Sequence, residues 1–443
     1  MITGLVRQAL RRHPWSFVGP AATQCLAAAI VTGALGIAHS LDNAPRHGPD
    51  RQTMADSGLT DVAALFVTIS VYLSVIIVGV TMGAAIARQA RDTALARAIG
   101  ATPGQVRRAI AVQSGVVALP ATAVGVPLGM LGGHAWVDGL AGHGIVAVPV
   151  PFTPHPAAPA AALAVTVGTS LLGALVAAIR PARVRPSVAL AETATPRRRV
   201  GVVRTVLGAA LVAGGVALAV VISGLDATTA DTAGLFVMLA MCVGAGLLGP
   251  ALLRTAAPAG RLFGDVGRLA ADNLAARART YSGALVPLTL AVAFATVTVA
   301  RASTAAHVTG VPEPAAERWM EYSGTGVYTA FAAVAALATL VATTLSRRRD
   351  LAVLRLTGGT RVRVLRVVVC EALLVTGTAL LVAAAVAATA LLPLLHTALG
   401  TWLPWLPAGQ WAAGVLALTA LVLAGTVPPA LAVLRHPPVD AVR

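Results

Sequence analysis

Residues 91–102 read Arg-Asp-Thr-Ala-Leu-Ala-Arg-Ala-Ile-Gly-Ala-Thr, and residues 349–360 read Arg-Asp-Leu-Ala-Val-Leu-Arg-Leu-Thr-Gly-Gly-Thr. The two segments lie 258 positions apart, and the match continues without a gap to Val106/Val364 and Arg108/Arg366. They share six residues, at Arg91/Arg349, Asp92/Asp350, Ala94/Ala352, Arg97/Arg355, Gly100/Gly358 and Thr102/Thr360. A repeat at a fixed distance indicates that the chain contains two copies of one structural unit.

Each copy predicts a short amphipathic helix followed by a sharp turn. The first helix would place apolar residues on one face, and the second has related ones: Leu95, Ala98 and Ile99, then Leu351, Leu354 and Leu356. Gly100 and Gly358 stand where a left-handed helix cap belongs. Thr102 and Thr360 follow as N-caps of the next helix. We call residues 88–108 the first elbow and residues 347–366 the second elbow.

The composition around the elbows is that of an integral membrane protein. Of 443 residues, 57% are hydrophobic and only 11% are charged, and the mean hydropathy is +0.81. Soluble proteins carry about 25% charged residues, so a soluble or a disordered chain is excluded. Stretches of about 20 apolar residues can cross a bilayer as helices. We predict an all-α, polytopic protein with ten transmembrane helices, at about 17–38, 62–87, 109–135, 157–179, 205–224, 232–253, 283–305, 323–345, 367–393 and 409–434.

Arginine positions predict the orientation of these helices. All 33 basic residues are Arg, and 29 of them fall on one side if the N-terminus is cytoplasmic and the sides alternate. Short cytoplasmic loops are enriched in basic residues. Both termini and both elbows are therefore predicted to be cytoplasmic. The Ala-rich, Lys-free composition favours a bacterial protein, hence a multi-pass protein of the plasma membrane.

The repeat also predicts the domain organisation. Six spans separate equivalent positions, and this even number makes the repeat parallel, with both halves facing the same way. A second similarity follows the fourth span of each half, where 183–190 resembles 435–442. We predict a four-helix module at 1–200, a two-helix connector at 201–255 and a second four-helix module at 256–443.

No site of independent chemistry is predicted. A phosphate-binding P-loop requires a lysine, and the sequence contains none, so the chain is not expected to be an ATP-hydrolysing enzyme. The net charge of +16 forms no basic stripe that would bind nucleic acid. Cys25, Cys242 and Cys370 lie in apolar stretches without metal-ligand spacing. We therefore predict no catalytic residue, no bound cofactor and no metal site.

These motifs resemble the FtsX-like, MacB-like permease family of ABC transporters. The resemblance lies in the Arg-Ala-Ile-Gly-Ala-Thr segment at 97–102, its weaker copy at 355–360 and the Glu-Ala pair at 371–372. The segments 271–277 and 438–442 are also similar to the lead-in and the ending of the family's modules. The four-two-four order of spans most resembles the bacitracin-resistance type, although such permeases usually carry a large extracytoplasmic domain that this chain lacks.

The resemblance implies a permease driven by a separate cytoplasmic ABC ATPase, present in two copies, which holds the ATP and Mg²⁺. The implied function is export or membrane extraction of an amphipathic, lipid-like or antibiotic-like substrate, with membrane lipids as further partners. It implies that the ATPase couples through Arg91, Asp92, Arg97, Ile99, Gly100 and Thr102 in the first elbow, and through Arg349, Asp350, Arg355, Leu356, Gly358, Thr360 and Glu371 in and beside the second. Substrate-binding residues are unknown.

Other interpretations stay open at this point. An ion-gradient-driven transporter would need an intramembrane acid, and Glu371 is the candidate. A sensor or immunity protein that uses an ATPase partner is a third class. Any single elbow arginine, Arg347 included, has the simpler interpretation of a contact with lipid headgroups. The first module has Gln113-Ser114 where the second has Glu371-Ala372, which predicts that the two halves dock unequally.

Overall fold

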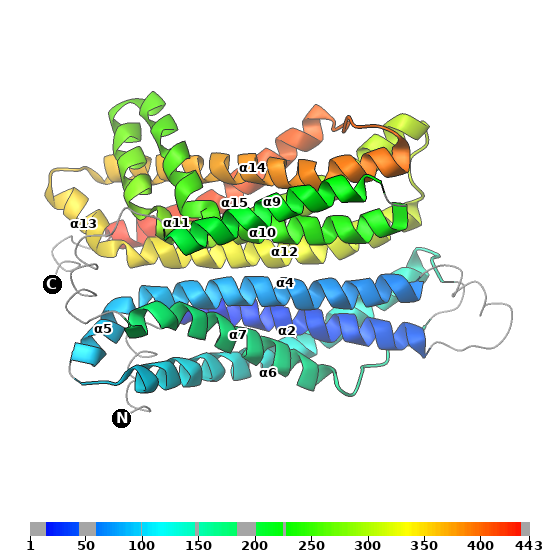
Figure 1. Cartoon of the computed structure of the whole chain (residues 1–443), viewed down its shortest axis with the longest axis horizontal. Helices are drawn as coiled ribbons and strands as arrows, with labels where there is room; N and C mark the ends of the chain where they lie inside the picture. The colour runs from blue at the N-terminus through cyan, green and yellow to red at the C-terminus, as the bar shows by residue number, and fades with distance from the viewer. Residues whose placement is uncertain are drawn as a thin grey trace. The chain divides into compact units, whose positions relative to one another are not determined.

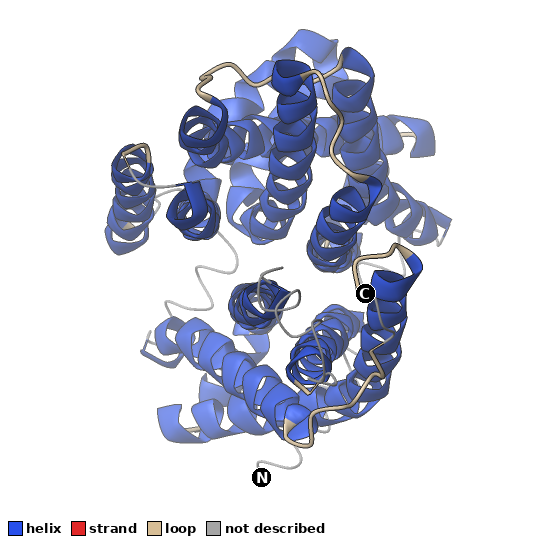
Figure 2. Cartoon of the chain, turned by 90° about the vertical axis from the view of Figure 1, so that its right-hand side faces the viewer, coloured by secondary structure: helices blue, strands red, loops and turns tan. Residues whose placement is uncertain are grey.

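A computed structural model of the chain describes residues 15–43, 59–98, 100–146, 150–183, 201–224 and 227–435. Within these ranges the regular structure is helical, and no strand occurs (Figure 2). A helix satisfies all its backbone hydrogen bonds internally, which a segment surrounded by lipid requires. The protein is a polytopic helical membrane protein.

The helices follow one another along the chain (Figure 1). Their bounds are α2 Trp15–Asp42, α4 Leu59–Arg88, α5 Ala90–Ala98, α6 Pro103–Gly142, α7 Ala158–Arg183, α9 Val202–Ile222, α10 Ala227–Ala256, the 3-10 helix η1 Ala257–Phe263, α11 Gly264–Thr309, α12 Ala315–Ser346, α13 Arg348–Leu356, α14 Arg361–Leu399 and α15 Ala408–Arg435. At 1.5 Å per residue α6 is about 60 Å long, which exceeds the roughly 30 Å of a bilayer's hydrocarbon core.

Among the described residues, nine helical stretches are long and apolar enough to cross a membrane. The predicted count of ten is not confirmed, because the predicted spans 232–253 and 283–305 fall in one stretch, Ala233–Thr309, of 77 residues. Inside this stretch, η1 and a positive φ of 69° at Gly264 separate α10 from α11. The other predicted spans each correspond to one observed helix.

The chain divides into two compact units. Unit 1 comprises Met1–Thr195 and Pro314–Phe331, and unit 2 comprises Pro196–Glu313 and Ala332–Arg443. The division assigns the first half of α12 to unit 1 and its second half to unit 2. The three-part organisation at 1–200, 201–255 and 256–443 stays a prediction.

In unit 1, α2 packs closely against α6, and α4 and α7 complete the bundle. Glycines on α6 permit the close approach. A Cβ atom on Gly129 would overlap the backbone of Ala29, and a Cβ on Gly125 would overlap that of Cys25. This arrangement is the small-residue packing of membrane helices.

In unit 2, α11 packs against α14 as α2 packs against α6, with α10, α15 and the second half of α12 around them. Its core is a continuous apolar cluster that includes Leu274, Leu285, Leu340, Val375 and Val422. The first long helix of each repeat thus packs against the helix that follows the elbow. The repeat in sequence is a repeat in packing.

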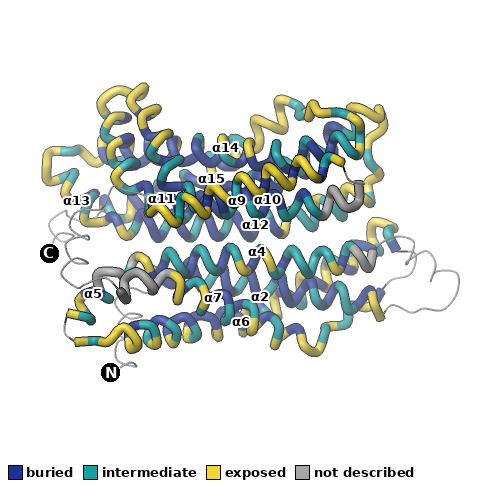
Figure 3. The backbone as a smooth tube through the Cα atoms, viewed as in Figure 1, coloured by how far each residue is buried: buried dark blue, intermediate teal, exposed yellow. Residues whose placement is uncertain are grey.

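The connector helices α9 and α10 form an antiparallel pair in unit 2. One face of α9 is strongly exposed, with Val203 at 81% and Val220 at 68%, as the yellow band along α9 shows (Figure 3). Arg204 reaches from α9 to α10, where its Nε donates to the Leu247 carbonyl (2.8 Å) and its Nη2 to the Gly246 carbonyl (2.9 Å). Pro250 has no N–H to offer Gly246, four residues earlier, so Arg204 replaces the missing donor.

Candidate functional site

The first elbow consists of α5, a glycine turn and the start of α6. Gly100 has a φ of 104°, which a glycine adopts without the steric cost of a Cβ. Thr102 caps α6: its Oγ1 accepts from the Gln105 N–H (3.3 Å), and the Gln105 Oε1 accepts from the Thr102 N–H (2.9 Å). This reciprocal capping box fixes the start of the helix, and Pro103 suits its first turn.

The second elbow repeats this backbone. Gly358 has a φ of 96°, and Thr360 caps α14 by accepting from the Arg363 N–H (3.2 Å). The Gly358 N–H donates to the Arg355 carbonyl (3.1 Å), as the Gly100 N–H donates to the Arg97 carbonyl (3.1 Å). The predicted glycine turns and threonine caps are confirmed in both copies.

The side chains of the two short helices divide into a buried and an exposed face. Ala94 and its equivalent Ala352 are buried, at 3% and 4% exposure. Leu95 and its equivalent Val353 are exposed, at 47% and 45%, and so is Leu356, at 53%.

The predicted apolar face is therefore wrong in part. Leu351 is buried in a cluster with Val364, Val368, Ala430 and Leu434, whereas Leu356 points away from that cluster. A separation of five residues places them on different sides of a helix of 3.6 residues per turn. The second elbow packs through Leu351 and leaves Leu356 at its surface.

A buried ion pair ties the second elbow to the bundle. Arg347, between α12 and α13, donates through Nη2 to Oε1 of Glu371 on α14 (2.9 Å) and through Nη1 to Oε2. Tyr281 on α11 donates its hydroxyl to Oε2 of Glu371 (2.9 Å), and the Arg347 guanidinium lies 5.6 Å from the centre of the Tyr281 ring. The three side chains are 4%, 0% and 2% exposed for Arg347, Glu371 and Tyr281 respectively. We call them the buried triad.

The buried triad bears on two of these interpretations. Arg347 is not a headgroup anchor, because its guanidinium lies inside the protein. Burial alone would lower the pKa of Arg347, but Tyr281 and Glu371 beside it raise that pKa above its ordinary value. Glu371 makes an elbow contact, since both of its carboxylate oxygens are bound by Arg347.

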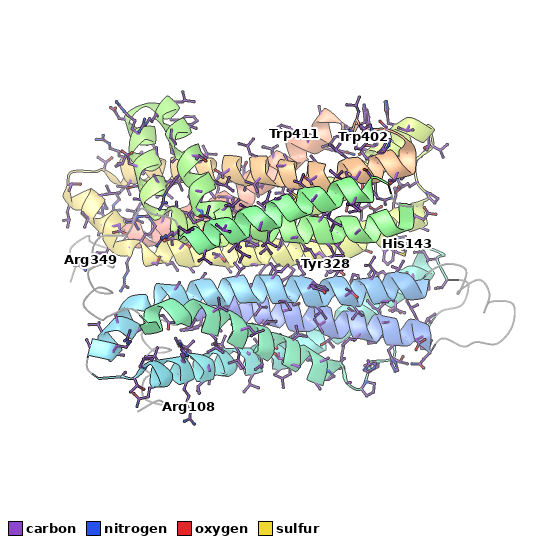
Figure 4. The ribbon with its side chains drawn as sticks, in the orientation of Figure 1. Arg108, His143, Tyr328, Arg349, Trp402 and Trp411 are labelled. Atoms are coloured by element: carbon purple, nitrogen blue, oxygen red, sulfur yellow. The ribbon has the colours of Figure 1, made fainter. Side chains whose placement is uncertain are left out.

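Further polar contacts hold the second elbow at its surface. Asp350 forms an ion pair with Arg277 of α11 (2.6 Å), and Arg355 donates to the Leu434 carbonyl of α15 (3.1 Å). Arg349 is exposed at this end of unit 2, and Trp402 and Trp411 lie at the other end (Figure 4). Asp350, Arg355 and Glu371 thus contact α11, α15 and the start of α13 respectively, whereas Arg349 and Leu356 lie at the surface.

The first elbow holds its predicted residues differently. Gln113 on α6 donates its Nε2 to Oε1 of Gln89, the residue between α4 and α5 (3.3 Å). Arg97 is half-buried. Arg91 and Asp92 lie on α5, but the structure does not describe their side chains, and Ile99 lies outside the described residues. The second sequence similarity, at 184–190 and 436–442, also lies outside them.

Sequence reasoning missed three residues of this arrangement. Arg347, Tyr281 and Gln89 were not singled out as site residues. The offset of 258 carries the signal for two of them, because it relates Gln89 to Arg347 in the same way as it relates Gln113 to Glu371. Within the described residues, no group of three His, Cys, Asp or Glu side chains could hold a metal ion.

Comparison with known families places the first repeat. Residues 64–186 match the FtsX-like permease C-terminal family, and no curated protein matches the chain. The match spans α4, the first elbow, α6 and α7. Proteins of this family are transport components that generally work with a cytoplasmic ATPase. The chain therefore contains an FtsX-like permease C-terminal domain at residues 64–186, and its helical, multi-span structure fits the ABC permease family.

Proposed function

We propose that the chain is the transmembrane subunit of an ABC transporter and that a separate ATPase, two copies per permease, drives it through the two elbows. The ATPase holds the ATP and Mg²⁺. The observation that carries this proposal is the matched pair of elbows, one of which lies in the FtsX-like segment 64–186. Two docking points of one design suit two identical ATPase subunits.

The surfaces of the elbows support docking. Leu95 and Val353 occupy equivalent positions and are both exposed, and Leu356 adds a further exposed apolar side chain to the second elbow. Arg348 and Arg349 are exposed beside them. An apolar anchor with a polar rim is the usual composition of a protein interface.

The arginine distribution supports a cytoplasmic position for both elbows. With 29 of 33 arginines on the elbow side, the positive-inside rule assigns that side to the cytoplasm. Both termini are then cytoplasmic, and the protein lies in the bacterial plasma membrane. Trp402, which lies just beyond the end of α14, and Trp411, near the start of α15, then face the outside.

We propose an amphipathic, lipid-like or antibiotic-like substrate that is exported or extracted from the outer leaflet. The strongly apolar spans favour access from the lipid side over a hydrophilic pore. The ion pair of Glu371 with Arg347 speaks against a gradient-driven transporter, because a carboxylate engaged on both oxygens is poorly available to a transported ion.

Co-expression with the ABC ATPases of the same genome tests this proposal. We expect one of them to copurify with the permease, with two ATPase chains per permease. Valine at Gly100 and Gly358 would force a β-branched residue to a positive φ, so we expect the variant Gly100→Val/Gly358→Val to separate ATP hydrolysis from transport.

The matched control is Gly104→Ala, in the same elbow, where a Cβ would meet only Thr102 Oγ1, at 4.0 Å. We expect this variant to behave as the natural protein. Absence of a copurifying ATPase, or normal substrate-stimulated hydrolysis in the double valine variant, would contradict the proposal.

A further inference from the structure

The two elbows are held to their bundles by pairs of side chains at equivalent positions. The pair is Arg347 and Glu371 in unit 2, and Gln89 and Gln113 in unit 1. Each pair joins the residue just before the short helix to the same turn of the helix that follows it. The offset of 258 relates both members, so the two pairs are two versions of one structural contact.

The chemistry of the two contacts differs. Glu371 accepts from both Nη atoms of Arg347, and bidentate, charged hydrogen bonds are the strongest that side chains make. Gln113 and Gln89 share one neutral hydrogen bond of 3.3 Å. Among the described residues, the Nε2 of Gln89 has no hydrogen-bond partner, and neither has the Nε of Arg347.

The contribution of the first long helix also differs between the two units. In unit 2 Tyr281 on α11 donates its hydroxyl to Glu371, which brings a third helix into the contact. In unit 1 the aromatic residue of α2 that packs against α4 and α6 is Phe17, which lies in a cluster with Ile86, Ile110 and Val117. Phenylalanine has no hydroxyl and adds packing without a hydrogen bond.

We infer that the second elbow is clamped to α11 and α14 by the buried triad and moves with them as one body, whereas the first elbow is held by a neutral pair and opens separately from its bundle. Arg347, Glu371 and Tyr281 are then positioning residues. A buried charged pair loses much more when it opens than a neutral pair does, because opening leaves each charge without its partner.

The consequence for transport rests on the proposed function. If an ATPase pulls on both elbows, motion of the second elbow reaches α11 and α14 directly. Motion of the first elbow is taken up in part by sliding between Gln89 and Gln113. The two halves then transmit the motion of their elbows to their bundles unequally, although their backbones are alike.

Hydrogen exchange of the purified full-length chain, without any ATPase, tests the inference. We expect the amides of 348–356 to exchange about tenfold more slowly than those of 90–98, because opening the second elbow must break the triad. Two double variants give each elbow the side-chain pair of the other: Arg347→Gln/Glu371→Gln and Gln89→Arg/Gln113→Glu. We expect the first to accelerate exchange in 348–356 about tenfold and the second to slow exchange in 90–98.

Two further variants separate the triad from general effects. Arg348→Gln/Arg349→Gln removes charge from exposed positions of the same elbow and is expected to leave its exchange unchanged. Tyr281→Phe removes one hydroxyl and is expected to accelerate exchange in 348–356 by a smaller factor. This variant and the first-elbow variant decide the question if the Arg347/Glu371 variant does not fold. In each variant, exchange in the connector helices α9 and α10 reports general loosening and is expected to stay constant.

Equal exchange of the two elbows in the natural protein would overturn the inference. So would a triad variant that accelerates exchange throughout unit 2 and not in its elbow. The proposed function fails separately, because it is tested by ATPase copurification and by the double valine variant and not by exchange in the elbows. Unequal elbows without an ATPase partner would keep the inference and reject the transporter.

Discussion

Glu371 lies in α14, where Arg347 donates to both of its carboxylate oxygens and the hydroxyl of Tyr281 donates to one of them. If one member of such a pair loses its charge, the charge of the other stays buried without a partner, which costs about 3–5 kcal/mol. We therefore expect Glu371→Gln to lower the free energy of unfolding by about this amount. Reversible unfolding in mixed detergent micelles would measure the change.

Glu317, near the start of α12, provides the control for this substitution. Its side chain is exposed, and Glu317→Gln is expected to change stability by less than about 0.5 kcal/mol. If Glu371→Gln were equally mild, the triad would not hold the second elbow.

At the same scale, residue chemistry explains what the sequence could and could not predict. Gly100, Gly358, Thr102 and Thr360 were predictable because glycine turns and threonine caps are local devices that their own residue types determine. The partner of Glu371 was not predictable from local pattern. Arg347 stands in a run of three arginines, 347–349, and only the packing of three helices selects the one that is buried.

Among the helices, the connector pair offers a separate test. Arg204 donates to the carbonyls of Gly246 and Leu247, the first of which lacks its helical partner because of Pro250. We expect Arg204→Met to destabilise the pairing of α9 with α10 by about 1–3 kcal/mol, the cost of leaving the buried Gly246 carbonyl unsatisfied. Limited proteolysis after 224 and unfolding in detergent would both report the loss.

The variant Pro250→Ala provides the rescue. Alanine restores the N–H that Gly246 needs, so Arg204→Met should cost less in a Pro250→Ala background than alone. Equal costs in the two backgrounds would mean that Arg204 does not compensate for the proline.

The helices themselves were largely predictable from apolar stretches of bilayer length. The extent of α11 was not, because it runs from Gly264 to Thr309 and its first turns are too polar to count as a span. Its lead-in carries Arg277, the partner of Asp350. Hydropathy locates the part of a helix that lies in lipid but not the polar extension that contacts an elbow.

For the whole molecule, the predicted parallel repeat makes a topological prediction. The six predicted spans between the elbows would place both elbows on one side of the membrane, and the arginine count predicts that this side is cytoplasmic. In a chain whose three cysteines are replaced, we expect Leu403→Cys to react with a membrane-impermeant maleimide in intact cells. Leu403 is 81% exposed beyond the end of α14.

The matched position is Thr357→Cys, in the second elbow, which should react only after the membrane is permeabilised. Labelling of Thr357→Cys in intact cells would reverse the orientation and remove the elbows from the reach of a cytoplasmic ATPase. Both positions are exposed in the structure, so access is limited by the membrane alone.

The central claim is that an ATPase binds both elbows. Photo-crosslinking tests it most directly, with p-benzoylphenylalanine placed at Leu95, at Leu356 or, as the control, at Trp411, which is 62% exposed at the opposite end of unit 2 from Arg349 (Figure 4). We expect crosslinks to the ATPase from Leu95 and from Leu356 and none from Trp411. Crosslinks from Trp411, or from neither elbow in a complex that hydrolyses ATP, would contradict the account.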